Sequence, residues 1–415
     1  MTMECFEKLK DYFLKNASRV LKEPVGKLKY PFVDPGADSY AGNLWDWDSY
    51  FTVKGLMGVF SAYSTEELFQ AGLTHERIAE HAKGCVLNFL ASQEEDGYIP
   101  IMISGEDLFA GYFHAEHEKG VPLNQHKPFL CQSALQAAEF AEDYSWIESE
   151  KLKKYLAYYE SKQYDKKSGL FFWQDDIMIG IDNNPTAFYR APRSSADIYL
   201  NSFLVLEYES LADILVRQGK DGTEFSNKAT ELKQAINREM WDERDGIYYS
   251  QDILFFKTDR SFGEIKFHEG LAPSWNSVPY KIRFWGCFLP LYAGICNGER
   301  AERLCEHLSD DDVFAKYGIR TLARNEKMYD LAKSSNPSNW LGAIWIVSNW
   351  LIGEGLQKYS KGALAEKIRI ATLNLLESNL EKYGEIFESY QPDTGEPNLN
   401  PRFLSWNLLV IRWLT

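Results

Sequence analysis

Apolar residues recur at helical spacing along the whole chain. From Asp197 to Leu215, for example, apolar positions lie three or four residues apart, which is the pattern of an amphipathic helix that Ser194 or Asp197 could cap. Similar stripes predict eleven further helices, over residues 5–20, 48–62, 76–90, 128–141, 147–162, 224–240, 282–295, 298–307, 340–352, 363–376 and 402–413. The pattern therefore predicts an all-α protein with twelve helices.

A short repeat follows two of these predicted helices. Tyr164-Asp165 with Gly169-Leu170-Phe171 is echoed by Trp241-Asp242 with Gly246-Ile247-Tyr248, and a looser third copy runs from Tyr383 to Phe387. Each copy turns at a glycine and continues as a short extended aromatic segment, so the repeated unit is a helical hairpin with a loop at one end. Six such hairpins could close into an inner and an outer ring, an (α/α)6 barrel. The repeat alone leaves an open α-solenoid as the alternative.

The helices are predicted to form one domain. No stretch rich in Pro, Gly and Ser separates the two halves of the chain, which favours a single closed barrel over residues 1–415, with short β-hairpins and loops at one mouth. The composition, 45% apolar and 25% charged residues, is that of an ordinary globular protein. The 45 basic and 60 acidic residues give a net charge of −15, which argues against a nucleic acid as partner.

Several other classes of protein are disfavoured. The longest uncharged apolar run, residues 284–296, is shorter than the roughly 20 residues that span a bilayer, and charged residues interrupt residues 1–16, so we expect a cytoplasmic protein without a membrane helix. The six cysteines show no CxxC spacing, and the seven histidines, which include His114 and His117, belong to no pattern of metal ligands. With no GxGxxG, P-loop or GxSxG motif either, we expect neither a metal nor an organic cofactor.

Aromatic residues are unusually frequent and stand beside acidic ones. Phe, Trp and Tyr make up 15% of the chain, and such rings suit stacking against sugar faces. If the segment that contains Trp45 and Trp47 is extended, the two rings point together, and Asp48 beside them could bind a pair of sugar hydroxyls. The alternative is that Asp48 or Ser49 caps the following helix and that the tryptophans belong to the core.

Two further acidic segments could supply acid and base chemistry. Asp182 follows an apolar, glycine-bearing segment, so a loop could hold its carboxyl partly desolvated, which raises the pKa and suits a general acid. An Asx turn is the alternative role for Asp182. Glu388 lies on an aromatic, extended segment and could act as a general base on water. Glu385 and Glu396 compete for that role by residue type, and an acidic loop could also be merely solvated.

Four motifs in chain order resemble glycoside hydrolase family 63. They are WDWDSYF from Trp45, IGIDNNP from Ile179, NPSNWLGAIW from Asn336, and FESYQPDTGEPN from Phe387 with Phe403-Leu404-Ser405-Trp406 after it. The resemblance spans nearly the whole chain and is strongest to the short bacterial members, which include hydrolases of mannosylglycerate and glucosylglycerate. It implies an (α/α)6 barrel, as in the related trehalases and glucoamylases, and an inverting mechanism.

The resemblance also implies roles for single residues. The general acid falls on Asp182 and the general base on Glu388, and no cofactor is required. The residues expected to bind substrate are Tyr40, Trp45, Trp47, Asp48, Lys127, Arg190, Arg193, Tyr329, Trp340, Trp345, Tyr390 and Trp406. Relatives often have an arginine directly after the proline that follows the acid, where this chain has Thr186. Arg190 or Arg193 could replace that arginine and bind a substrate carboxylate as a bidentate fork.

The expected activity is inverting hydrolysis of a small carbohydrate. The substrate is an α-glucoside or α-mannoside, either a 2-O-glycosylglycerate or a short oligosaccharide. Within the enzymes, the alternative is a trehalase-like hydrolase or an oligosaccharide α-glucosidase. A sugar-binding relative with weak catalysis is the alternative outside them, and the presence of both Asp182 and Glu388 argues against it. The oligomeric state depends on surface shape and stays open.

Overall fold

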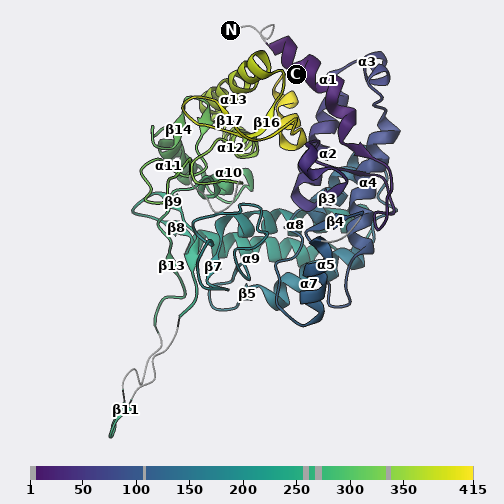
Figure 1. The fold of residues 1–415 in the computed structure, drawn as a ribbon. Helices are drawn as coiled ribbons and strands as arrows, with labels where there is room; N and C mark the ends of the chain where they lie inside the picture. The colour runs from purple at the N-terminus through teal and green to yellow at the C-terminus, as the bar shows by residue number, and fades with distance from the viewer. Residues whose placement is uncertain (1–5, 106–108, 256–260, 267–272, 333–337, 415) are drawn as a thin grey trace.

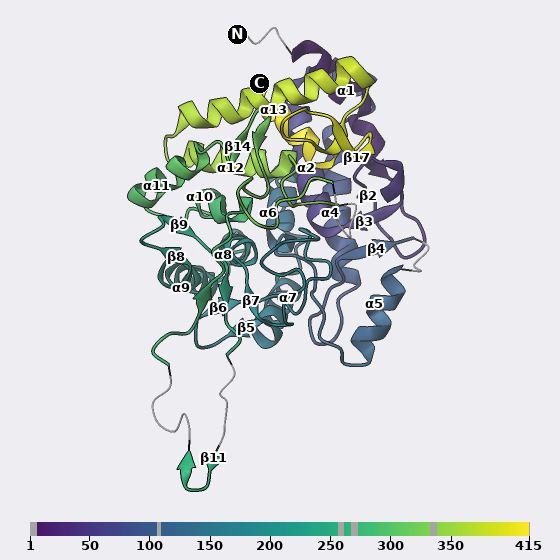
Figure 2. The same ribbon diagram turned by 60° about the vertical axis from the view of Figure 1, so that its left-hand side comes forward.

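The computed structural model describes residues 6–105, 109–255, 261–266, 273–332 and 338–414, and helical elements lie at all twelve predicted places. Figures 1 and 2 show them as an inner ring of helices surrounded by an outer one. The inner elements are α2 (Asp46–Ala62), α6 (Leu130–Ala141), α8 (Ile198–Arg217), η4 with α10 (Trp285–Phe288 and Leu289–Tyr292), α12 (Ile346–Lys358) and η5 (Ser405–Trp413). The outer elements are α1 (Glu7–Asn16), α4 (His75–Ala91), α7 (Ser149–Lys162), α9 (Thr223–Glu239), α11 (Gly298–Leu308) and α13 (Gly362–Tyr383).

The inner ring is closed. Each inner element packs against the next one along the chain, and the last, η5, packs against the first, α2. An open solenoid would leave α2 and η5 at opposite ends without contact, so that alternative is excluded. The chain forms an (α/α)6 barrel, in which every inner helix buries apolar residues on both sides and Asp197 caps α8 as predicted.

Several predicted helices have different boundaries; α13, for example, extends to Tyr383, and two others start late or break within their stripes. The stripe over 340–352 becomes helical only at Ile346, because Gly342 has a φ of +128° and Ile344 pairs with Tyr390 as an isolated β-bridge. The stripe over 282–295 becomes a 3-10 turn followed by one α-helical turn, since Pro290 has no backbone N–H to donate. The segment before α12 is therefore a loop that can present side chains at the end of the barrel.

Two short helices lie outside the ring and are not indicated by the apolar pattern: α3 (Thr65–Gln70) and α5 (Phe109–Glu118). The start of α3 did carry a signal, because Ser64 and Glu67 form a capping box in which each side chain bonds the other's backbone N–H. The remaining helical turns are η2 (Ala17–Val20) and η3 (Asp38–Tyr40).

The predicted repeat is a β-hairpin that joins an outer helix to the next inner one. It recurs as β5–β6 (Tyr164–Asp165, Leu170–Phe171) and β8–β9 (Trp241–Asp242, Ile247–Tyr248), where Gly169 and Gly246 have φ of +76° and +72°. The third copy was predicted at the wrong place. It is β14–β15 (Phe314–Ala315, Gly318–Ile319) after α11, whereas Gly384 ends α13 in a left-handed conformation.

The other strands form small antiparallel sheets. These are β1 (Leu21–Lys22) with β2 (Phe32–Val33), β3 (Asn43–Trp45) with β4 (Met102–Ser104), β7 (Ser195–Ala196) with β10 (Gln251–Asp252) and β13 (Val278–Pro279), β11 (Ser261–Phe262) with β12 (Ile265–Lys266), and β16 (Phe387–Tyr390) with β17 (Pro397–Pro401). Figure 2 shows the β11 hairpin extending away from the barrel.

The described residues include five of the six cysteines. Cys85, Cys131, Cys287 and Cys296 are buried free thiols and Cys305 is a half-buried one. None of the helices described here combines the length and apolar character that a membrane span needs. Cys5, His268 and Asn336 lie outside the described residues.

Candidate active site

The inner helices begin around a cavity of about 460 Å³, a size that suits a small ligand. Its walls come from residues at or just before the first turns of α2, α6, α12 and η5, and from the loop that leads to α8. The lining residues are Tyr40, Trp45, Trp47, Asp48, Lys127, Met178, Gly180, Asp182, Ser338, Trp340, Trp345, Glu388, Leu399, Asn400 and Trp406. Ten of the fourteen site residues predicted from the sequence are therefore brought together here.

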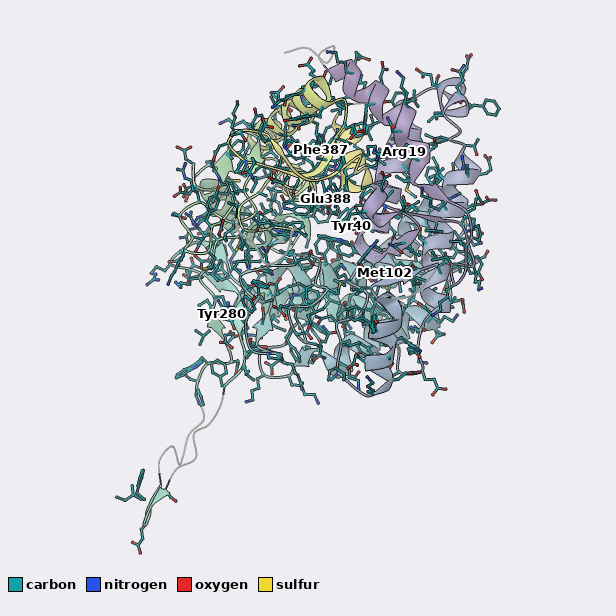
Figure 3. All side chains as sticks on the ribbon, viewed as in Figure 1. Arg19, Tyr40, Met102, Tyr280, Phe387 and Glu388 are labelled. Atoms are coloured by element: carbon teal, nitrogen blue, oxygen red, sulfur yellow. The ribbon has the colours of Figure 1, made fainter. Side chains whose placement is uncertain are left out.

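Glu388 lies in strand β16, as its extended segment predicted, and is 3% exposed. The Tyr40 hydroxyl donates to its carboxylate, 3.1 and 3.2 Å from the two oxygens, and Asn400 Nδ2 donates to Oε2. Figure 3 shows Tyr40 and Glu388 next to each other. Burial and the nearby charges of Asp48 and Asp182 raise the pKa of Glu388 to about 8, against the effect of the two hydrogen bonds.

Asp182 lines the same cavity from the loop before α8. Two side chains pin the end of this loop to the buried Asp197, because Asn184 Nδ2 and Thr186 Oγ1 donate to Asp197 Oδ2 at 2.9 and 2.6 Å. Burial raises the pKa of Asp182, and a hydrogen bond with the Ser338 hydroxyl and the charge of Lys127 oppose that rise. The carboxyl is therefore partly desolvated, as predicted for a general acid.

Asp48 is a third acid in the same cavity. The helix α2 begins at Asp46 with Trp45 at its N-cap position, so Asp48 and Ser49 lie within the first turn and the prediction that one of them caps the helix is wrong. Burial raises the pKa of Asp48 to about 7, with a further contribution from Asp46 and opposing effects of Lys127 and the Ser405 hydroxyl. The carboxyl of Asp48 faces the cavity beside the two tryptophans.

Lys127 and Asp46 form a buried ion pair under this acid. Lys127 Nζ lies 2.6 Å from Asp46 Oδ1, and the two side chains are 3% and 0% exposed. The backbone N–H of Lys127 also donates to Asp46 Oδ2 at 2.7 Å, and that of Trp47 donates to Oδ1. The pair joins the start of α2 to the segment before α6 and so holds these two parts of the cavity lining together.

Tryptophans form much of the wall. Trp340 and Trp345 stack with ring centroids 3.9 Å apart and an interplanar angle of 10°. Trp47 lies 5.8 Å from Trp340 and 5.6 Å from Trp406 in tilted or edge-on contacts. These rings are almost fully buried, so they serve both the core and the cavity, and the two alternatives weighed from the sequence are combined in one cluster.

Four predicted binding residues do not line the cavity. Arg190 and Arg193 are exposed, and their guanidinium groups lie 3.9 Å from the Tyr280 ring centroid and 5.2 Å from that of Phe172. Figure 3 shows Tyr280 apart from Glu388, toward the lower left of the view. Thr186, at the position of the family arginine, is buried, and its hydroxyl donates to Asp197.

The other two are tyrosines that support the site from outside. Tyr329 packs on Gly342, where an added Cβ would come within 2.2 Å of its ring. Tyr390 is buried, and its hydroxyl accepts the backbone N–H of Phe387 at 2.7 Å, which turns it away from the cavity. They hold the tryptophan loop and β16 in place.

The competing acids of the β16 segment are placed elsewhere. Glu385 lies 3.8 Å from Arg402, and the exposed Glu396 pairs with Lys382. Of the acids in this segment, Glu388 is therefore the one that faces the cavity.

Among the described residues, no three His, Cys, Asp or Glu side chains come together as a metal-binding group.

Sequence reasoning missed Asn400, Ser338, Met178, Gly180 and Leu399. Asn400 faces Glu388 across the β16–β17 hairpin, since the flanking pairs are Phe387 with Pro401 and Ser389 with Leu399. A signal was present in the sequence, because FESY and PNLN flank a Thr-Gly turn at hairpin spacing. The register that sets Asn400 against the acid follows from that hairpin.

Comparisons with known proteins give a consistent result. The family model described as "Mannosylglycerate hydrolase MGH1-like glycoside hydrolase domain" matches residues 41–406. Mannosylglycerate hydrolase MGH1 of Selaginella moellendorffii is 34% identical over 110 residues, which cover 26% of this chain and 20% of that protein. Mannosylglycerate hydrolase of Thermus thermophilus is 23% identical over 254 residues, 61% of this chain and 52% of that protein. The matched part thus spans at most about half of these relatives.

Solved structures share the fold. A GH63 mannosylglycerate hydrolase from Thermus thermophilus in complex with Tris and D-glycerate superposes with a TM-score of 0.70 at 19% identity, covering 97% of this chain and 100% of that one. Neutral trehalase Nth1 from Saccharomyces cerevisiae reaches 0.60 at 15% identity, over 100% of this chain and 80% of that one. At such identities the likeness concerns the barrel alone.

Proposed function

This chain belongs to the mannosylglycerate hydrolase MGH1-like glycoside hydrolase family, and we propose that it hydrolyses a small α-glucoside or α-mannoside with inversion at the anomeric carbon. The observation that carries the proposal is the meeting of two acids. Asp182 and Glu388, more than 200 residues apart in the chain, line one tryptophan-walled cavity. We also propose that residues 1–415 act as one catalytic domain.

Each acid has one task in this mechanism. Asp182, protonated, donates its proton to the glycosidic oxygen as the bond from that oxygen to the anomeric carbon breaks. Glu388, ionised, takes a proton from a water whose oxygen attacks the anomeric carbon from the opposite face. The products are the free alcohol and a sugar of inverted configuration, with no covalent intermediate. A proton then passes from Glu388 to solvent and another returns to Asp182.

The reactive form of the site has the proton on Asp182 and the charge on Glu388. Burial raises the pKa of both carboxyls, and the charge of Asp182 raises that of Glu388 further, so the acids compete for protons. The hydrogen bonds from Tyr40 and Asn400 favour the ionised form of Glu388. Tyr40 and Asn400 therefore act as positioning residues that increase the fraction of enzyme in the reactive form.

The remaining lining residues suit a sugar ring. The tryptophans offer apolar faces that match the C–H face of a pyranose, and Asp48 can accept from two adjacent hydroxyls. The relatives named mannosylglycerate hydrolase point to a 2-O-glycosylglycerate as one substrate, and the likeness to a trehalase makes α-linked disaccharides the others to be tested.

The test is a substrate panel read by proton NMR. Wild type should hydrolyse at least one of trehalose, kojibiose, nigerose, 2-O-α-glucosylglycerate and 2-O-α-mannosylglycerate, and the β-anomer should appear first. Asp182→Asn and Glu388→Gln should each lower turnover by about a hundredfold or more. Asp176→Asn, on the same loop, and Glu385→Gln, next to the same strand, are matched controls and should stay within about twofold of wild type. An initial α-anomer, or full activity in either main variant, contradicts the mechanism.

A further inference from the structure

The described lining of the cavity has little positive charge to offer a substrate. Of the described residues that line it, Lys127 alone carries a positive charge, while Asp48, Asp182 and Glu388 are acids. The Lys127 ammonium is already 2.6 Å from Asp46, and both groups are buried. Because Asp46 balances that charge, the ion pair leaves no net charge for a bound anion.

The acids keep a negative charge in the reactive form. The mechanism proposed above needs Glu388 ionised and Asp182 protonated, and Asp48 adds charge whenever it is ionised. A substrate carboxylate would therefore enter next to at least one uncompensated carboxylate. In a poorly hydrated cavity such repulsion is stronger than in bulk water. The N-termini of the inner helices carry partial positive charge, but at α2 the first turn already holds Asp46 and Asp48.

The arginines that could have supplied a counter-charge are engaged elsewhere. Arg190 stacks on Tyr280 and donates through Nε to the Pro185 carbonyl at 3.2 Å. Arg193 lies over Phe172. At the position where relatives often have an arginine, the buried Thr186 bonds to Asp197 behind the loop. None of these three side chains lines the cavity.

We infer that the leaving group of this enzyme is neutral and is a glycerol or a sugar rather than a glycerate. The inference rests on the glycosidase function proposed above and concerns the substrate class of that same site. Hydroxyl groups match the lining, because the Asp48 carboxylate and the amide oxygen of Asn400 are acceptors that lie among aromatic rings. The chain then differs in its preferred leaving group from the relatives named for mannosylglycerate.

A matched pair of substrates tests the charge alone. 2-O-α-glucosylglycerol and 2-O-α-glucosylglycerate differ in a hydroxymethyl group against a carboxylate, and the mannosyl pair provides the same comparison for the other sugar. We expect kcat/KM to be at least about tenfold higher for the neutral member at low ionic strength, with the gap narrowing as salt screens the repulsion. Equal or better hydrolysis of the glycerate overturns this inference and leaves the proposed function standing. No hydrolysis of any α-glycoside overturns both.

A single added charge gives a second test. Met178 lines the cavity on the loop before Asp182, and its unbranched side chain is similar in length to arginine. Met178→Arg should raise the ratio of glycerate to glycerol hydrolysis by about tenfold over Met178→Gln, which makes the same site polar without charge. Equal ratios in the two variants would show that charge does not set the preference.

Discussion

Replacing Asn400 with alanine removes one donor from the carboxylate of Glu388 and leaves the rest of the cavity wall in place. Asn400 and Glu388 face each other across the β16–β17 hairpin, and the second donor, the Tyr40 hydroxyl, remains. Because Asn400 stabilises the ionised form of Glu388 more than the neutral one, its loss lowers the population of enzyme with the charge on Glu388 and the proton on Asp182. The variant should therefore bind sugar and lose rate.

The size of the expected loss in kcat/KM follows from the burial of Glu388. A hydrogen bond to a charged group contributes about 1.5 to 3 kcal/mol, and about 1.4 kcal/mol is a factor of ten. Glu388 is 3% exposed, so water can replace little of the lost bond. We expect kcat/KM of Asn400→Ala to fall by about tenfold to a hundredfold at its optimum pH.

The assay is kcat/KM from pH 5 to 10, together with thermal unfolding. Asn398→Ala is the matched control, since Asn398 is an exposed asparagine on the same strand. Asn400→Asp gives a signature that a purely structural role would not produce: when protonated it can donate like asparagine, so its activity should approach wild type at low pH and disappear as pH rises. An Asn400→Ala enzyme with unchanged Tm and kcat/KM within twofold of wild type would refute the reasoning.

Two further predictions concern stability. Lys127→Met leaves the buried Asp46 charge unpaired and should lower the free energy of unfolding, measured in urea, by about 3 to 5 kcal/mol. The double variant Asp46→Asn, Lys127→Met should recover most of that loss. A loss below about 1 kcal/mol in Lys127→Met would contradict the prediction. Burial raises the pKa of Glu207 to about 7 and of Glu388 to about 8, so the folded state holds protons that the unfolded state has lost, and Tm should fall as pH rises from about 6.5 to 8. The buried His126, with a pKa lowered to about 4, opposes this decline, but its contribution fades by about pH 7.5, where the unfolded-state imidazole has lost its proton as well. Glu207→Gln should make Tm fall less steeply with pH. A wild-type Tm that stays constant or rises over this pH range would contradict the prediction.

The fold could be predicted in some detail because helical periodicity reports burial locally. The stripe from Asp197 to Leu215 became α8 with the expected cap, and the residues of that helix are buried on nearly all of its sides. Boundaries failed where tertiary contacts overrode the stripe, as at Gly342 and Ile344, where pairing with β16 holds the chain extended. The third repeat was misplaced for a related reason, because a glycine that ends a helix and a glycine that turns a hairpin look alike in sequence.

For the site, too, some predictions from the sequence held and others failed. Trp47, Asp182 and Glu388 could be named because the motifs that contain them resemble those of glycoside hydrolase family 63, whereas the residue types alone left other roles open. Arg190 and Tyr390 could be suspected on the same grounds, yet one stacks on a partly exposed tyrosine and the other bonds within its own strand. Residue type reports what a side chain can do, whereas its direction depends on the backbone that carries it.

By itself the amino-acid sequence determined the class of fold and the family resemblance, and it nominated the two candidate acids. Only the tertiary structure decided that the ring closes through α2 and η5, that Asn400 faces Glu388, and that Lys127 is neutralised by Asp46. The physical reason is range: helix formation and capping depend on neighbours within a few residues, while charge balance in a cavity depends on groups that folding brings together from distant parts of the chain.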